Sequence, residues 1–260
     1  MENKSSEIQV ELNGLCEKMR QAGYEEFKID RVIKIISELQ KRAVGGLDKL
    51  LKILSQRLSN KEEYSDILRE GRFARILARN GFKQIEIEYA KKATDVKATY
   101  NRRTVYFEIT RKRENEEDNA IHQSKEGVGW ILPYRVENLL STIQGKLRQL
   151  KDRELNIVVL WSDTVSLNNR EFEETIKCIQ QEIDTAPQIY RRMSGILFTT
   201  GGVSYSYGTP KQFHPFSNDK ADVRLPNRLA SKLQSMTEED PRKLHKEYEG
   251  LVAAMKKHSH

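Results

Sequence analysis

Hydrophobic residues in the first 58 positions recur every three or four residues, the spacing typical of amphipathic α-helices. The predicted helices are residues 8–19, ended by Gly23; residues 30–39, capped by Asp30; and residues 47–58, which follow Gly45-Gly46. The third helix has a broad apolar face. This face predicts packing on a neighbouring element or on a second copy of the chain. The second alternative is a homodimer formed through the N-terminal helices.

From Lys61 onward the pattern changes between helical and alternating spacing. Helices are predicted over residues 61–80, 136–150, 172–183 and a short stretch after Pro226, and strands over residues 85–89, 94–99, 104–110, 156–161, 195–200 and 203–207. Gly201-Gly202 predicts a tight hairpin between the last two strands. Gly81 ends the first of these helices, and Gly71 inside it predicts a close contact or a break.

This order of elements predicts an α/β fold in which a mixed β-sheet is flanked by helices on both sides. We expect three parts: a helical N-terminal extension over residues 1–60, the α/β domain over residues 61–235, and a charged C-terminal tail over residues 236–260.

Composition narrows the setting of the chain. Of its 260 residues, 37% are hydrophobic, and no apolar run approaches the roughly 18 residues that a membrane span requires. The first residues contain no secretory signal, and two distant cysteines, Cys16 and Cys178, predict no disulfide framework. We therefore expect a soluble cytoplasmic protein that does not contact a membrane.

Positive charge is concentrated in one segment. The net charge of the chain is +7, yet residues 69–113 alone hold thirteen Lys and Arg against five Asp and Glu. A local surplus of this size favours an anionic partner such as nucleic acid.

Two carboxylates lie within this basic segment, on neighbouring predicted strands. Asp95 belongs to one strand and Glu108 to the next, and Glu70 lies on the preceding helix. Hard cations such as Mg²⁺ prefer carboxylate oxygens and keep several bound waters. Such an ion polarises a phosphodiester and activates water for attack.

Glu70, Asp95 and Glu108-Ile109-Thr110 resemble the motif of the PD-(D/E)XK nuclease superfamily, to which the restriction endonucleases belong. The resemblance covers about residues 62 to 208. It implies a restriction-endonuclease-like fold, with Asp95 and Glu108 as ligands of Mg²⁺ or Mn²⁺, assisted by the Ile109 carbonyl. It also implies that Glu70 orients a metal-bound water.

Two positions depart from the family pattern. Thr94 replaces the proline before the aspartate, and Thr110 occupies the position of the catalytic lysine. That lysine stabilises charge that develops in the transition state, which a hydroxyl cannot do. Lys112 shares a strand face with Glu108 and is our predicted replacement, and Lys97 is the second candidate.

Several other residues allow two interpretations. Arg72, Arg75, Arg79, Lys97 and Arg111 are predicted to bind nucleic acid, although the three helical arginines fit a solvated helix face equally well. Lys146 and Gln149 lie on a later helix, where solvated surface is the favoured interpretation. The side chains interpreted as ordinary loop or cross-strand residues are His122, His214, Tyr205, Tyr207 and Phe213.

The sequence thus predicts a metal-dependent nuclease that hydrolyses phosphodiester bonds in DNA. The alternatives are a catalytically inactive module that kept the fold and binds nucleic acid, and an interaction component whose N-terminal helices recruit a protein partner.

Overall fold

The computed structural model describes residues 2–87, 95–111, 133–161, 169–200 and 212–238. Its helices are α1 (Glu2–Gln21), α2 (Glu26–Lys41), α3 (Leu47–Gln56), α4 (Lys61–Arg79), α6 (Pro133–Leu147), α7 (Asn169–Thr185), α8 (Pro187–Tyr190) and α9 (Asn227–Gln234). Its strands are β1 (Lys83–Ile87), β2 (Val96–Tyr100), β3 (Arg103–Arg111), β4 (Asn156–Trp161), β5 (Gly195–Thr200) and β6 (Gln212–Ser217). Within these ranges, none of the helices has the length and apolar character needed to cross a membrane.

The six strands form one mixed sheet in the order β1-β2-β3-β4-β5-β6. The β3–β4 and β4–β5 pairs are parallel, and the other three pairs are antiparallel. Helix α6 connects the first parallel pair, and α7 with α8 connects the second. The prediction of an α/β fold with a mixed sheet between helices is therefore confirmed.

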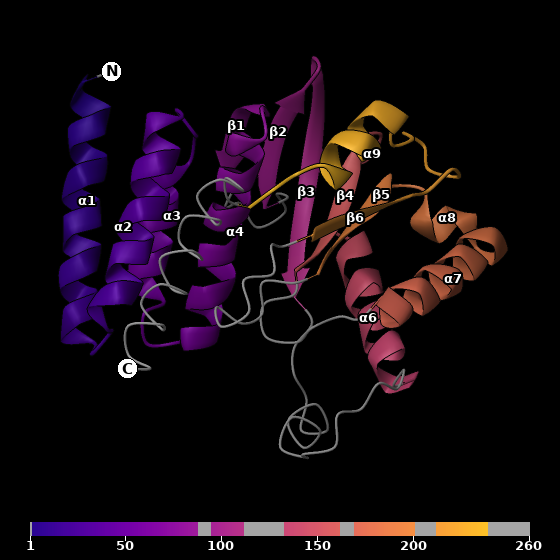
Figure 1. The fold of residues 1–260 in the computed structure, drawn as a ribbon, viewed down its shortest axis with the longest axis horizontal. Helices are drawn as coiled ribbons and strands as arrows, with labels where there is room; N and C mark the ends of the chain where they lie inside the picture. Colours follow the sequence, from indigo (N-terminus) through magenta and orange to yellow (C-terminus); the bar gives the residue numbers. More distant parts are fainter. Residues whose placement is uncertain (1, 88–94, 112–132, 162–168, 201–211, 239–260) are drawn as a thin grey trace, which may run out of the picture.

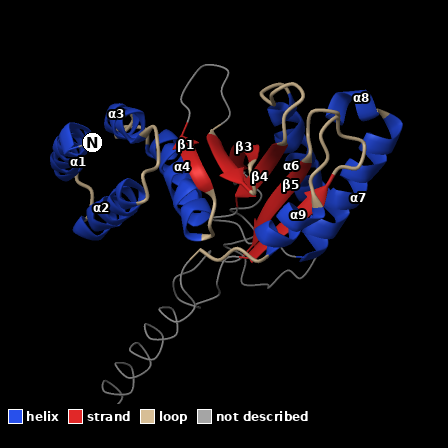
Figure 2. Cartoon of the chain, turned by 90° about the horizontal axis from the view of Figure 1, so that it is seen from above, coloured by secondary structure: helices blue, strands red, loops and turns tan. Residues whose placement is uncertain are grey.

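Two hydrophobic clusters cover the two faces of the sheet. On one face, α4 and α9 pack against the sheet, through side chains such as Phe107 and Val159, and α1 to α3 extend the same hydrophobic cluster beyond α4. The other face packs on α6 and α7 through Val158 and Leu160. Figures 1 and 2 show α1 to α4 on one side of the sheet and α6 with α7 on the other. The position of a residue in a strand therefore decides which helices it meets.

The boundary of helix α4 follows the predicted glycine signals. Asn80 is its C-cap, and Gly81 adopts φ of +85°, as the residue after a helix end commonly does. Gly71 does not break the helix. A Cβ atom there would lie 3.3 Å from Leu50 of α3, so this glycine marks a close contact between the two helices.

The apolar face of α3 is covered within the chain. Leu47, Leu50, Leu51 and Leu54 are buried in the same cluster as side chains of α1, α2 and α4. This packing accounts for the apolar face without a second copy of the chain.

Two local predictions are wrong. Asp30 does not cap the second helix, because α2 begins four residues earlier, after its N-cap Glu25. The antiparallel partner of β5 is β6, in which Gln212 lies opposite Thr200, rather than residues 203–207. Those residues and the Gly201-Gly202 turn lie outside the described residues, as does the loop over residues 112–132.

Gly46 fixes the connection from the N-terminal helices to the sheet. It adopts φ of +80°, and a Cβ atom there would lie 2.1 Å from the backbone oxygen of Ile87. Its neighbour Gly45 exchanges backbone hydrogen bonds with β1, to the Ile85 oxygen and from the Ile87 amide. The backbone is therefore held against the strand edge at a position that excludes a side chain.

We expect Gly46→Ala to lower the free energy of unfolding by about 2–4 kcal/mol, because the left-handed backbone is strained and the methyl group collides with the strand. The matched control is Gly14→Ala within α1, where a Cβ atom meets nothing within 4 Å. That variant should gain about 0.5–1 kcal/mol. Urea denaturation measures the free energy of unfolding of both variants. Equal effects of the two substitutions would show that Gly46 is not held against the strand as described.

Candidate active site

The register of β2 and β3 brings the two predicted metal ligands together. Val96 lies opposite Phe107, and Lys97 lies opposite Tyr106. Extending this antiparallel register by one residue places Asp95 opposite Glu108. Side chains of directly opposed residues leave the same face of a sheet, with Cβ atoms about 4.5–5.5 Å apart. The two carboxylates thus share one face at the end of the β2–β3 ladder.

Backbone contacts hold Asp95 in place. Its Oδ2 atom accepts a hydrogen bond of 2.6 Å from the backbone N–H of Ile109, the residue after Glu108. The carboxylate is therefore tied to the neighbouring strand although it precedes the first residue of β2. Burial raises the pKa of Asp95, against the opposing effects of the Lys146 charge and this hydrogen bond.

Glu108 is enclosed on the face covered by α6 and α7. It pairs in register with Val158 of β4, a core residue on that face, and its side chain is 1% exposed. Its Oε2 atom is buried and has no hydrogen-bond partner in the described part of the chain. A buried carboxylate oxygen without a donor, next to a second carboxylate, is a chemically suitable ligand for a hard cation.

Lys146 of α6 supplies the positive charge at this site. Its Nζ atom lies 2.7 Å from Oε1 of Glu108 and also donates to Oε1 of Gln149 at 3.2 Å. The expectation that Lys146 and Gln149 form solvated surface is therefore wrong for Lys146, whose side chain is 23% exposed. The reason is geometric: α6 crosses β3 with this side chain directed toward Glu108.

The sequence contains a signal for this lysine. Leu139, Ile143 and Leu150 are buried on α6 or just after it, and Lys146 falls between them at spacings of four, three and four. It occupies a position in the apolar stripe, where a lysine is rarely found without a partner.

The charge of Glu70, on α4, acts on the ammonium group of Lys146. Burial alone would lower the pKa of Lys146, but the charges of Glu108, Asp95 and Glu70 outweigh burial and raise it. The structure thus brings the three predicted carboxylates into electrostatic range of one ammonium group. Among the described residues, no group of three or more His, Cys, Asp and Glu forms a metal cage, so an ion here would need water or backbone ligands in addition.

Of the two predicted replacements for the family lysine, one lies within the described residues. Lys97 is on β2, where its Nζ is 3.6 Å from Glu86. Thr110 is half-buried and two residues from Glu108 on the same strand. Lys112 lies outside the described residues, and its predicted role stays untested.

The predicted nucleic-acid contacts Arg72, Arg79 and Arg111 are engaged inside the protein. Arg72 bonds Glu238 at 2.8 Å, Arg79 bonds Glu38 at 2.5 Å, and Arg111 lies 2.9 Å from Asp66. Arg75 is 6% exposed. The interpretation of the helical arginines as a solvated face is therefore wrong, because α4 is covered by α2 and by residues 237–238. Their burial also gives no support to contacts with a nucleic-acid backbone.

The aromatic and histidine residues interpreted as ordinary loop or cross-strand residues fall into two groups. Two of them lie in β6, and the others lie outside the described residues. Phe213 of β6 is buried in the core, and the ring centroid of His214 lies 5.3 Å from that of Phe172. Burial lowers the pKa of His214. Residues His122, Tyr205 and Tyr207 lie outside the described residues.

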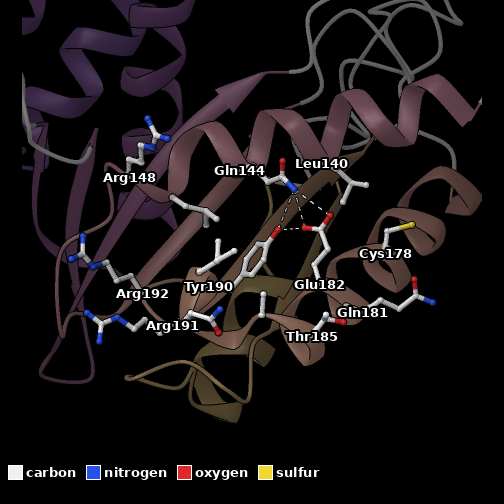
Figure 3. A pocket seen from close by; sticks show the side chains of 14 residues that line it. Leu140, Gln144, Arg148, Cys178, Gln181, Glu182, Thr185, Tyr190, Arg191 and Arg192 are labelled. Carbon is white, nitrogen blue, oxygen red and sulfur yellow. Dashed lines mark hydrogen bonds between the residues drawn. The ribbon is translucent and has the colours of Figure 1, made fainter.

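A groove of about 980 Å³ between α6, α7 and α8 is separate from the carboxylates (Figure 3). Gln144 donates a hydrogen bond of 2.9 Å to Glu182, and the hydroxyl of Tyr190 donates to the same carboxylate. Burial and this hydrogen bond raise the pKa of Tyr190 to about 12. Because these polar groups satisfy one another and none of the predicted site residues lines the groove, we assign no chemistry to it.

The carboxyl of Glu108 should make stability depend on pH. Burial first, and the Asp95 charge second, raise its pKa from 4.5 to about 7, against the opposing effect of Lys146. The folded chain therefore keeps a proton that the unfolded chain releases, and the stabilisation by this proton is lost as the pH rises through about 7.

In metal-free buffer, we expect this carboxyl to lower the free energy of unfolding by about 1–3 kcal/mol between about pH 5 and about pH 8. Glu108→Gln has no proton to lose and should remove this part of the decrease. Urea denaturation at both pH values compares the two proteins. An identical pH dependence in wild type and variant would show that the carboxyl is not perturbed.

Comparison with known proteins adds no identification. Neither a protein-family model nor a curated protein matches the chain, and no solved structure matches it. Functional inference therefore rests on the residues and their geometry.

Proposed function

We propose that this chain is a metal-dependent nuclease with a restriction-endonuclease-like fold, and that it hydrolyses phosphodiester bonds in DNA. The observation that carries the proposal is the juxtaposition of Asp95 and Glu108 by the β2–β3 register, with the ammonium group of Lys146 at 2.7 Å from Glu108. Two carboxylates and a lysine at one point are the groups that metal-assisted phosphodiester cleavage needs.

Asp95 and Glu108 are the proposed ligands of Mg²⁺ or Mn²⁺. The free Oε2 atom of Glu108 and the carboxylate of Asp95 fit a hard cation that completes its shell with water. When bound, such an ion polarises the phosphate and lowers the pKa of a bound water. Glu70, whose charge acts on Lys146, is the proposed group that orients this water.

Lys146 takes the role of the lysine that Thr110 replaces. A lysine on another element serves the same purpose if its ammonium reaches the reacting phosphate. What stabilises the transition state is a positive charge at the right point in space, whichever part of the sequence supplies it. Lys146 reaches Glu108 from α6, with its pKa raised, so it remains positively charged at neutral pH.

A basic and aromatic surface continues from the site along the same sheet face. Lys97 and Tyr106 face each other across β2 and β3, two residues from Asp95 and Glu108, and the Nζ of Lys151 lies 4.0 Å from the Tyr106 ring centroid. Lysines next to the reacting groups can hold backbone phosphates, which supports nucleic acid as the substrate.

The same geometry permits a second function, a nucleic-acid-binding module without catalysis. It is favoured by the closed Lys146–Glu108 ion pair, which would act as a purely structural contact. The enzyme and the module differ in their response to metal, since binding through backbone phosphates depends on salt and not on a divalent cation.

The test is cleavage of supercoiled plasmid and of labelled single- and double-stranded oligonucleotides with Mg²⁺, Mn²⁺ or EDTA. We expect cleavage with either metal and none with EDTA. Binding without cleavage under every metal condition would support the module, and cleavage that persists in EDTA would contradict the proposed mechanism. A parallel RNA substrate tests the choice of DNA.

A further inference from the structure

Arg75 is a buried cation on α4 that the proposed nuclease site does not use. Its side chain is 6% exposed, and its Nε atom is fully enclosed without a hydrogen-bond partner. In the described part of the chain, neither a hydrogen bond nor an ion pair is formed by its guanidinium. Burial is the main cause of the lowered pKa of Arg75. A guanidinium withdrawn from water in this way calls for an anion.

The carboxylates near Arg75 bind the neighbouring arginines of α4 instead. Arg72 and Arg79 lie three and four residues away on the same face of α4. Glu238 bonds Arg72 at 2.8 Å, and both oxygens of Glu38 bond Arg79, at 2.5 and 2.6 Å. The charges of Glu238 and Glu38 act on Arg75 only at longer range, where they are opposed by those of Arg79 and Arg72.

We propose that Arg75, flanked by Arg72 and Arg79, binds a small phosphate-type oxyanion. A tetrahedral oxyanion presents oxygens in several directions and can accept hydrogen bonds from neighbouring guanidinium groups, whose planar forks match phosphate well. Because only 6% of the Arg75 side chain is exposed, the ligand is free phosphate or the terminal phosphate of a small molecule rather than a duplex backbone. The inference does not depend on the nuclease proposal.

The test compares melting temperatures with and without inorganic phosphate, at an ionic strength held constant with chloride. We expect phosphate to raise the melting temperature of the wild-type chain in a saturable way, and to have no effect on Arg75→Met. In phosphate-free buffer, Arg75→Met should melt higher than wild type, because an apolar side chain of similar length replaces an unpaired buried charge.

The matched control is Arg148→Met, which changes an exposed arginine at the end of α6 (Figure 3) and should respond to phosphate as wild type does. A phosphate response that is absent from wild type, or that persists in Arg75→Met, overturns the proposal. If Arg75→Met does not fold, Arg75→Lys replaces it. That variant keeps the charge without the fork and should bind phosphate at least tenfold more weakly by calorimetric titration, whereas unchanged affinity overturns the proposal.

Two further experiments distinguish a nucleotide ligand, free phosphate and a carboxylate of the chain itself. A nucleoside 5′-monophosphate that binds more tightly than phosphate indicates a nucleotide ligand, and equal or weaker binding indicates the free ion. Glu239 and Asp240 follow Glu238 in the sequence and could supply a carboxylate. The double variant Glu239→Gln/Asp240→Asn tests this possibility. If it lowers the melting temperature in phosphate-free buffer and creates a phosphate response that wild type lacks, the partner of Arg75 is one of these carboxylates and the proposal fails.

Discussion

Replacing Lys146 by methionine should lower the rate of metal-dependent DNA cleavage by about 100- to 1,000-fold, the usual cost of losing one group that stabilises transition-state charge. Methionine keeps much of the aliphatic length but removes the ammonium that lies 2.7 Å from Glu108. Single-turnover cleavage kinetics measure the effect on the chemical step, and DNA affinity in Ca²⁺ measures binding separately. The loss should appear in the rate and not in the affinity.

A matched control and a rescue accompany this prediction. Lys177→Met changes an exposed lysine of α7, whose only role in the described residues is an ion pair with Glu174, and should leave cleavage unchanged. Thr110→Lys in the Lys146→Met background places a lysine at the family position and should restore part of the rate. Full activity of Lys146→Met would assign the ammonium to structure alone.

Asp95→Asn should reduce cleavage by at least about 1,000-fold, because the metal site loses one of its two carboxylates. The asparagine oxygen can still accept the hydrogen bond from the backbone of Ile109, so the β2–β3 connection should survive. Mn²⁺ affinity, measured by calorimetry, should fall in parallel with activity. This coupling separates loss of metal from loss of fold.

The control for this variant is Asp184→Asn, the same chemical change at an exposed position of α7. Its metal affinity and its activity should equal those of wild type. If Asp95→Asn binds Mn²⁺ as tightly as wild type, Asp95 is not a ligand, whatever happens to the rate.

Periodicity predicted most of the fold because most elements bury one clear face. The meander of β1, β2 and β3 and the buried strand β4 follow from alternation and from a continuous apolar run, and each lies within a few residues of its predicted bounds. The partner of β5 was mispredicted because Gly201-Gly202 is a strong local turn signal, whereas strand pairing is decided by the whole register.

The candidate site was predicted in part. Asp95 and Glu108 stand close in the sequence on paired strands, so their approach could be derived from local pattern alone. Lys146 could not be assigned in this way, because its contact with Glu108 spans 38 residues and depends on how α6 crosses the sheet. Strand alternation favours Lys112 as the replacement, but alternation along one strand does not show which side chains arrive from other elements.

Charge counting was least informative about individual arginines. The surplus over residues 69–113 predicted exposed phosphate contacts, yet Arg72 and Arg79 are bound to Glu238 and Glu38, which lie far from them in the sequence. A local charge total cannot include such distant partners. Among the described residues, the basic side chains on the sheet face beside the carboxylates include Lys97 and Lys151, in addition to Lys146.

The most direct test of the nuclease site is a crystal structure of the protein soaked in Mn²⁺. We predict one ion between the carboxylate of Asp95 and Oε2 of Glu108, about 2.0–2.3 Å from an oxygen of each, with Lys146 remaining beside it. Manganese scattering absent from this point at saturating Mn²⁺, with the Lys146–Glu108 ion pair intact, would contradict it.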